Sequence, residues 1–318
     1  MYDVVALGEL LIDFTSSGTS SQGNPLFEAN PGGAPCNVLA MLSKLGRSCA
    51  FVGKVGLDLF GRQLKDTIQQ AGICSDGLVL DPKAHTTLAF VHNAPDGDRE
   101  FSFYRDPGAD ELLTAQELPR ELLAHTRVFH FGSLSLTRQP AREATRAAVE
   151  QASAAGALIS FDPNLRASLW DSLDRAREEM LWGCSVCQVL KVAEEELEFL
   201  TGQKDLSAGA AQLRRRFPNV RLLLVTRGKE GSLAFWEGLA VECPAFPQAN
   251  TIDTTGAGDT FCACCLHHVL EFGLDGLSQE QLTRMLRFAN AAAGLITTKK
   301  GAIRSMPEPA DIQRLIGG

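Results

Sequence analysis

Residues 251–265 read TIDTTGAGDTFCACC, and this stretch decides how the fold of the chain is interpreted. A turn of small residues at 256–258 runs directly into an apolar, helix-like segment at 261–272. Backbone N–H groups at a helix start bind anions, and residues without bulky side chains let a phosphoryl group approach them closely. Asp259 then stands beside that group, where a carboxylate can accept a hydroxyl proton. The alternative is that Asp259 only caps the helix, which stabilises it by ~0.3–1 kcal/mol.

Two other glycine patterns do not meet the requirements of known nucleotide-binding motifs. Gly56 and Gly61 have the spacing of a P-loop, but Arg62 and Gln63 follow where that motif needs a lysine and a hydroxyl residue. The turn at 255–261 lacks the third glycine of the dinucleotide fingerprint and lies late in the chain. The sequence therefore argues against a Walker-type ATPase and against a dinucleotide-dependent oxidoreductase.

Composition and charge exclude several protein classes. The 318 residues are 45% hydrophobic and 21% charged, as in ordinary globular proteins. A net charge of −8 with scattered basic residues argues against nucleic-acid binding, and no apolar stretch reaches the length of a membrane span. Nine cysteines without regular spacing predict reduced thiols and a cytoplasmic location. The clusters at 184–187 and 262–268 contain metal-ligand residue types, but we interpret them as buried structural residues.

Strand-like runs alternate with helical patterns along most of the chain. The predicted strands lie at 3–8, 49–53, 127–132, 157–162, 186–193 and 221–228. The predicted helices lie at 35–46, 60–72, 139–155 and 207–216. Such alternation predicts a single domain, 1–318, built on a mostly parallel sheet with helices on both faces.

Two segments depart from this alternation. Residues 86–105 alternate like two strands joined by a turn that contains Asp96 and Gly97, which is a hairpin signal. Residues 18–33, rich in glycine and serine, are too long for an ordinary loop between a strand and its helix. We predict that both belong to one small β lid with approximate limits 9–35 and 85–108. Two unrelated surface excursions are the alternative.

Two signatures give the chain a family resemblance. TIDTTGAGDTF (251–261) closely resembles the carboxy-terminal signature of the ribokinase/PfkB family of sugar kinases. NPGGAPCNVLAMLSKLG (30–46) and FVGKVGLDLFG (51–61) resemble its amino-terminal signature, and the likeness extends over essentially the whole chain. The segments most similar to fructokinases are REFSFYRDPGADELL (99–113), FHFGSLSL (129–136), FDPNLRASLW (161–170) and EEELEFLTG (194–202).

The resemblance implies a ribokinase-like three-layer α/β/α sandwich with a mostly parallel central sheet and a small β-sheet lid. It also implies a kinase site in which Asp259 is the base and the turn before it holds the γ-phosphoryl group. The matching catalytic positions are Gly256, Ala257, Gly258 and Asp259. The matching sugar-binding positions are Asp13, Gly32, Gly33, Asn37, Phe103, Arg105 and Arg166, with Arg105 reaching in from the lid.

The resemblance further implies that the cofactors are ATP, Mg²⁺ and K⁺. The nucleotide-side positions are Lys191, Glu196, Thr226, Gly228, Gly231 and Asn290. Glu196 is expected to act on magnesium through water, although Ala193 stands where many family members have an asparagine ahead of this glutamate. The positions that match the family's monovalent-cation site are Asp253, Thr255, Gly301 and Ser305.

These features predict ATP-dependent phosphorylation of a sugar hydroxyl, with fructose yielding fructose 6-phosphate as the leading reaction. A kinase for 2-keto-3-deoxygluconate or a ribose-like sugar is the runner-up. A nucleotide- or sugar-binding regulatory protein that keeps the fold without turnover is the alternative from another class, and the intact Asp259 argues against it. The exposed lid sheet leaves a homodimer open.

Overall fold

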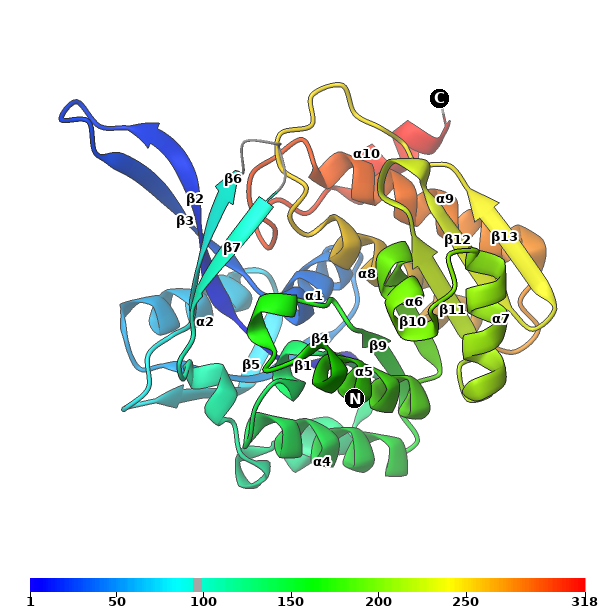
Figure 1. Ribbon diagram of the computed structural model, residues 1–318, viewed down its shortest axis with the longest axis horizontal. Helices are drawn as coiled ribbons and strands as arrows, with labels where there is room; N and C mark the ends of the chain where they lie inside the picture. Colours follow the sequence, from blue (N-terminus) through cyan, green and yellow to red (C-terminus); the bar gives the residue numbers. More distant parts are fainter. Residues whose placement is uncertain (94–98, 318) are drawn as a thin grey trace.

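In residues 1–93 and 99–317, which the computed structural model describes, a nine-stranded sheet forms the centre of the molecule (Figure 1). The strands lie side by side in the order β13 (Leu239–Cys243), β12 (Ser232–Trp236), β11 (Leu222–Thr226), β10 (Val189–Ala193), β9 (Leu158–Asp162), β8 (Thr126–Gly132), β1 (Tyr2–Leu7), β4 (Cys49–Gly56) and β5 (Ile73–Asp81). The pairings from β11 to β5 are parallel, whereas β12 pairs antiparallel with both of its neighbours. The carboxyl ends of the parallel strands therefore share one edge, where such sheets bind ligands.

Helices cover both faces of this sheet. One face carries α1 (Ala34–Lys44), α2 (Leu59–Gln70), α8 (Ala257–Phe272), α9 (Gln279–Ile296) and α10 (Pro309–Gly317). The other carries α3 (Arg120–Ala124), α4 (Ala141–Ala154), α5 (Leu173–Val186), α6 (Glu194–Thr201) and α7 (Leu206–Arg216). Alternate side chains of a strand enter the two cores, with Val4 on the α1 side and Val5 on the α4 side. The predicted three-layer architecture is confirmed.

Local sequence explains how these elements form. Residues of β4 are buried along the whole strand, which is why a parallel strand reads as a nearly continuous apolar run. At the start of α2 the Asp58 carboxylate accepts a hydrogen bond from the Gly61 amide at 2.8 Å. Short 3₁₀ turns connect the larger elements, namely η1 (Ala109–Leu112), η2 (Ala115–Glu117), η3 (Leu134–Leu136), η4 (Ala167–Leu169) and η5 (Gly228–Glu230).

A separate four-stranded sheet extends from the same edge (Figure 1). Its strands lie in the order β3 (Pro25–Gly32), β2 (Leu11–Thr19), β6 (Leu88–Asn93) and β7 (Arg99–Tyr104). β2 runs parallel to β6, with Ile12 beside Leu88, and this pairing joins the two hairpins. The two irregular segments therefore lie in one small sheet, and we call this sheet the lid.

One local expectation differs from the structure, and other strands had no separate prediction. Residues 186–188 were expected to begin a strand, but α5 continues to Val186 and the Cys187 amide donates to the Gly183 carbonyl, so β10 begins at Val189. β2 lies within the predicted lid segment 9–35, although no separate strand is predicted at its position, and the antiparallel hairpin of β12 and β13 has no predicted counterpart. The predicted turn residues Asp96 and Gly97 lie outside the described residues. No helix in the described part of the chain has the length and apolarity needed to cross a membrane.

Candidate active site

Two cavities meet at the start of α8. One, of about 250 Å³, has a largely polar lining, and we call it the polar cavity. The other, of about 320 Å³, we call the apolar cavity. Thr254 and Gly258 line both. The predicted site residues that line the polar cavity are Asp13, Gly33, Asn37, Phe103, Arg166, Lys191, Thr255, Gly256, Gly258 and Asp259. Those that line the apolar cavity are Thr226, Gly228, Gly231, Ala257, Gly258 and Asn290.

Asp259 lies in the first turn of α8 and is only 8% exposed. Its Oδ2 accepts a hydrogen bond of 2.7 Å from Nδ2 of Asn37, which is on α1. Burial raises the pKa of Asp259 above its ordinary value, while the Asn37 hydrogen bond and the charges of Lys191 and Arg166 oppose this shift. The carboxylate therefore faces a partner 222 residues away in sequence, which differs from the local contact expected of a helix cap.

The glycine turn before Asp259 has the geometry of an anion site. Gly256 adopts φ 78°, a left-handed conformation that favours glycine, and an added Cβ would lie 2.9 Å from Cβ of Ala302. The Ala257 amide donates to the Thr254 carbonyl at 3.2 Å, so it is already engaged. Among the described residues, the amides of Gly256 and Gly258 have no such backbone acceptor. These two amides are the donors that can bind an anion.

The buried side chain of Lys191 lies next to this turn. Nζ of Lys191, on β10, lies 3.0 Å from Oδ2 of Asp162 at the end of β9. The Asp162 carboxylate keeps the pKa of Lys191 above its ordinary value despite the cost of burial, so the lysine is charged. A Cβ added to Gly258 would lie 3.2 Å from the same Nζ. The positive charge is therefore close to both the anion site and Asp259.

The opposite wall of the polar cavity is formed by the lid and α1. The pKa of Asp13 is raised to about 7, first by burial and then by the charges of Asp253 and Asp259, whereas Arg166 opposes the shift. Gly32 packs against this carboxylate, because an added Cβ would lie 2.3 Å from Oδ2 of Asp13. Gly33 has φ 121°, and its Cβ would meet the Glu9 carbonyl oxygen at 2.4 Å. The chain therefore turns tightly into α1 at this glycine pair.

Sequence reasoning missed Glu9, which also lines the polar cavity. Its Oε1 accepts a 2.8 Å hydrogen bond from the Ala34 amide at the start of α1. Burial raises its pKa to about 7, and the nearby Asp110 charge adds to this while Arg105 opposes it. An acid inside the apolar run VVALGELLI was the available signal, since a buried carboxylate needs a specific partner.

Glu9→Gln is expected to change how stability depends on pH. Because its pKa is raised, Glu9 keeps its proton between about pH 4.5 and 7 in the folded state but loses it in the unfolded state. The contribution of this proton to the free energy of unfolding is therefore full at low pH and is lost as the pH rises through 7. Glutamine keeps an acceptor for the Ala34 amide and never ionises. We expect urea unfolding to show the variant gaining roughly 2 kcal/mol relative to wild type between pH 5 and pH 8.

The control for this prediction is Glu150→Gln on α4, where the glutamate is exposed. That variant should follow the wild-type pH dependence. A difference between Glu9→Gln and wild type that stays constant from pH 5 to pH 8 would contradict the assignment of a buried, titrating Glu9.

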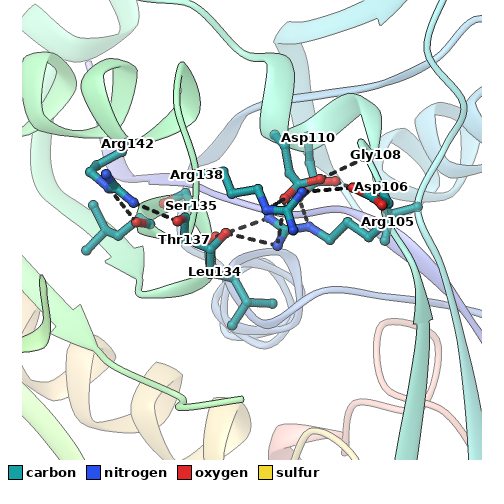
Figure 2. A network of polar contacts seen from close by, with 12 residues as sticks. Arg105, Asp106, Gly108, Asp110, Leu134, Ser135, Thr137, Arg138 and Arg142 are labelled. Carbon is teal, nitrogen blue, oxygen red and sulfur yellow. Dashed lines mark hydrogen bonds and ion pairs between the residues drawn. The ribbon is translucent and has the colours of Figure 1, made fainter. Parts of the chain in front are cut away.

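Arg105, which the resemblance assigns to sugar binding, is held by protein groups in the structure. Its side chain is 2% exposed, and among the described residues it is absent from the lining of the polar cavity. The guanidinium belongs to the network of Figure 2, where its Nη2 pairs with Oδ2 of Asp110 at 2.7 Å. Contact between Arg105 and a sugar therefore stays a prediction, and in the structure the buried Asp110 carboxylate binds the guanidinium.

Some of the predicted nucleotide-side residues line the apolar cavity, and two, Asn290 and Glu196, hold nearby backbone through hydrogen bonds. Asn290 borders the apolar cavity, but its Nδ2 donates to the carbonyls of Cys243 and Pro244 at 3.0 and 3.1 Å. It therefore holds the chain that forms the cavity rim. Both oxygens of Glu196 accept amide hydrogen bonds of 2.7 Å, from Leu165 and from Ala193. The Glu196 carboxylate therefore caps α6 and holds the loop after β9. At position 193, where many family members have an asparagine, Ala193 takes part in this cap through its backbone amide.

The four predicted potassium-site residues lie in one neighbourhood. Asp253 accepts hydrogen bonds from the amides of Thr255, at 2.8 Å, and of Gly301, at 3.1 Å. The Ser305 hydroxyl donates to the Lys300 carbonyl. These contacts join the loop before α8 to the loop before α10, and they gather carboxylate, hydroxyl and carbonyl oxygens.

The cysteines of the two clusters lie inside the molecule. Cys184, Cys187, Cys262, Cys264 and Cys265 are buried free thiols. Within the described residues, no group of three or more histidine, cysteine, aspartate or glutamate side chains is arranged to hold a metal.

Comparison with known proteins agrees with this geometry. The family model for pfkB family carbohydrate kinase matches residues 1–309. Fructokinase-1 of Zea mays is 44% identical over 315 residues, which cover 98% of this chain and 97% of that protein. Fructokinase-1 of Oryza sativa subsp. japonica is 42% identical with the same coverage.

Solved structures are similar over the whole chain. Fructokinase with bound ATP from Xylella fastidiosa has a TM-score of 0.89 and 32% identity, covering 100% of this chain and 99% of that one. Fructokinase from Vibrio cholerae O395, in a form with fructose, ADP and calcium ion, has a TM-score of 0.87 and 30% identity, covering 99% of each chain. With a family match from residue 1 to residue 309, this chain belongs to the pfkB family of carbohydrate kinases.

Proposed function

We propose that this chain transfers the γ-phosphoryl group of ATP to the primary hydroxyl of fructose, giving fructose 6-phosphate. The observation that carries the proposal is the position of Asp259, buried and bonded to Asn37 next to the junction of the two cavities. A carboxylate there lies between an acceptor in the polar cavity and phosphates that extend from the apolar cavity. The similarity to fructokinases over nearly the full chain supports fructose as the acceptor.

The polar cavity supplies groups that bind hydroxyls. Asp13 offers carboxylate oxygens, and the buried Oδ1 of Asn37 has no hydrogen-bond partner in the described part of the chain. A buried acceptor of this kind costs stability unless a ligand satisfies it. We assign it to a sugar hydroxyl, with Arg166 and Phe103 completing the wall.

The reaction requires one proton acceptor and one anion site. As the fructose oxygen attacks the γ-phosphorus, its proton passes to Asp259, whose raised pKa suits this role. The amides of Gly256 and Gly258 donate to the phosphoryl oxygens as charge develops, and the Lys191 cation lies close behind them. The bond to ADP breaks on the opposite side of the phosphorus.

The proposed reaction uses two metal ions, magnesium and potassium. Magnesium bound to the ATP phosphates would neutralise their charge. The oxygen donors around Asp253, Thr255, Gly301 and Ser305 suit a hard monovalent cation such as K⁺. A cation there orders the loop that leads into the glycine turn.

We also propose that residues 1–318 form one kinase domain whose lid, approximately 9–35 and 85–108, closes over the sugar. Leu11, Asp13 and Phe103 already line the cavity from the lid. Closure brings these residues onto the acceptor and excludes water, which would otherwise compete for the phosphoryl group.

ADP release with ATP and magnesium tests the proposed function. We expect turnover with fructose to exceed turnover with ribose, glucose, 2-keto-3-deoxygluconate and adenosine, and potassium to raise it. Turnover confined to another acceptor would overturn fructose while leaving the kinase chemistry in place. Absence of turnover with every acceptor would favour a regulatory protein.

The outer face of the lid supports a homodimer as part of this proposal. Phe90 stacks on Phe14 at 4.9 Å between ring centroids and meets Phe27 and Tyr104 edge-on. Tyr104 is 67% exposed and Phe27 is 38% exposed, so these two rings of the cluster face solvent in a single chain. Sedimentation velocity should give a dimer for wild type and for the control Leu173→Ser, and a monomer for Tyr104→Ser. A monomeric wild type would overturn the dimer.

A further inference from the structure

The buried carboxylate of Asp110 bridges the base of the second lid hairpin. β6 and β7 are antiparallel with Leu88 opposite Tyr104, so Thr87 and Arg105 are the next pair toward the main sheet. Oδ1 of Asp110 accepts a hydrogen bond of 2.5 Å from the Thr87 hydroxyl. Oδ2 of the same carboxylate accepts from Arg105 Nε at 2.8 Å. One side chain of η1 therefore holds both strands of the hairpin.

Arg105 also reaches the wall of the polar cavity (Figure 2). Its Nη1 donates to the Thr137 hydroxyl at 3.0 Å, and its Nη2 donates to the Leu134 carbonyl at 3.1 Å. The Leu134 residue lines the cavity on the main-domain side. Phe103, two residues before Arg105 on β7, lines it on the lid side. The guanidinium thus lies between two walls of one cavity and is bonded to both segments.

Gly108 indicates that this arrangement is tightly packed. An added Cβ would lie 1.9 Å from the Thr87 hydroxyl, 2.7 Å from Oδ1 of Asp110 and 2.9 Å from Cγ of Arg105. All three atoms belong to the same set of contacts. Any side chain at this position would displace Thr87, Asp110 or Arg105, so the contacts leave room for glycine alone.

We propose that Thr87, Arg105 and Asp110 form a clamp at the base of the lid, and that Arg105 is a positioning residue for phosphorylation of the sugar. The clamp sets the place of Phe103 relative to Leu134 and hence the width of the polar cavity. This inference rests on the proposed kinase function. It requires no contact between Arg105 and the sugar, in contrast to the role that the resemblance implies.

The chemistry of the clamp explains why an arginine holds this position. A planar guanidinium can donate in several fixed directions at once, here to a carboxylate, a hydroxyl and a carbonyl. A lysine keeps the charge, but its three donors lie on one nitrogen and do not form the fixed planar arrangement of a guanidinium. The Thr87 carbonyl also accepts from the Ile12 amide of β2 at 3.2 Å, so movement at the clamp reaches the first lid hairpin as well.

Two variants test the clamp without removing its charge. Thr87→Val deletes one hydroxyl and keeps the side-chain volume, and Arg105→Lys replaces the planar guanidinium by an ammonium group. Thr67→Val on α2 is the matched control, because Thr67 and Thr87 are equally buried at 2% exposure. We expect both clamp variants to raise KM for fructose about tenfold and to change KM for ATP by less than about twofold. We also expect more ADP release without sugar, relative to kcat with fructose, than in Thr67→Val.

Hydrogen exchange of the protein without ligands separates this inference from the proposed function. Amides of 88–93 and 99–104 should exchange faster in Thr87→Val than in wild type, with no such change in Thr67→Val. Wild type that does not phosphorylate fructose would overturn the function and leave this exchange result as the test of the clamp. Unchanged exchange and an unchanged fructose KM in Thr87→Val would overturn the clamp. So would a raised KM in Arg105→Lys alone, since Arg105 would then act on the sugar itself.

Discussion

Asp259→Asn is expected to lower kcat with fructose by ~10²–10⁴-fold while ATP and fructose still bind. Asparagine has nearly the shape of aspartate and keeps an oxygen that can accept the 2.7 Å hydrogen bond from Asn37, so the cavity retains its form. The amide cannot take the proton of the attacking hydroxyl. Steady-state ADP release measures the loss of turnover, and calorimetric titration measures binding of each substrate.

Asp205→Asn is the matched control for this variant. Asp205 caps α7 by accepting a hydrogen bond from the Ala208 amide at 2.7 Å, and it does not line either cavity. Its substitution should leave kcat unchanged and alter stability only slightly. If Asp259→Asn behaves in the same way, Asp259 is a helix cap and the proposed mechanism fails.

Lys191→Met is expected to destabilise the fold by about 3–5 kcal/mol and also to abolish most of the turnover. The substitution leaves the Asp162 carboxylate buried without its cation, which lies 3.0 Å away in the native protein. It also removes the positive charge next to Gly258 and the anion site. Urea unfolding measures the first effect, and ADP release below the unfolding transition measures the second.

A double variant, Lys191→Met with Asp162→Leu, separates these two effects. Replacing both members of a buried ion pair by apolar groups is often neutral for stability. We therefore expect the double variant to recover most of the lost stability but not the lost turnover. Recovery of both would mean that Lys191 serves only as the partner of Asp162.

The sequence predicts the elements whose signals are local. The strands and helices of the main sheet alternate clearly because a parallel sheet buries its strands on both faces. β2 carries no such signal, since its second half, from Ser16 onward, is largely exposed and lies in a sheet with little core. The end of α5 was misassigned because a buried helix end and a buried strand have the same apolar composition.

The candidate site also contains residues that local sequence predicts and residues whose place depends on distant contacts. The glycine turn and Asp259 are contiguous, so their chemistry can be predicted from one stretch. The place of Arg105 depends on Asp110, only five residues later, and charge spacing alone does not tell whether such a pair faces solvent or the interior. Asn290 and Glu196 have the residue types of ligand contacts, yet backbone groups distant in sequence engage them instead.

The two cavities draw on different parts of the chain. Before β10, the residues of the polar cavity run from Glu9 to Arg166, whereas every residue lining the apolar cavity lies between 226 and 297. Only the start of α8, with Thr254 and Gly258, serves both. Under the proposed function, acceptor and donor recognition therefore use largely separate parts of the chain. We therefore expect that changes between residues 9 and 166 alter the choice of sugar, in evolution or in engineering, without rebuilding the nucleotide site.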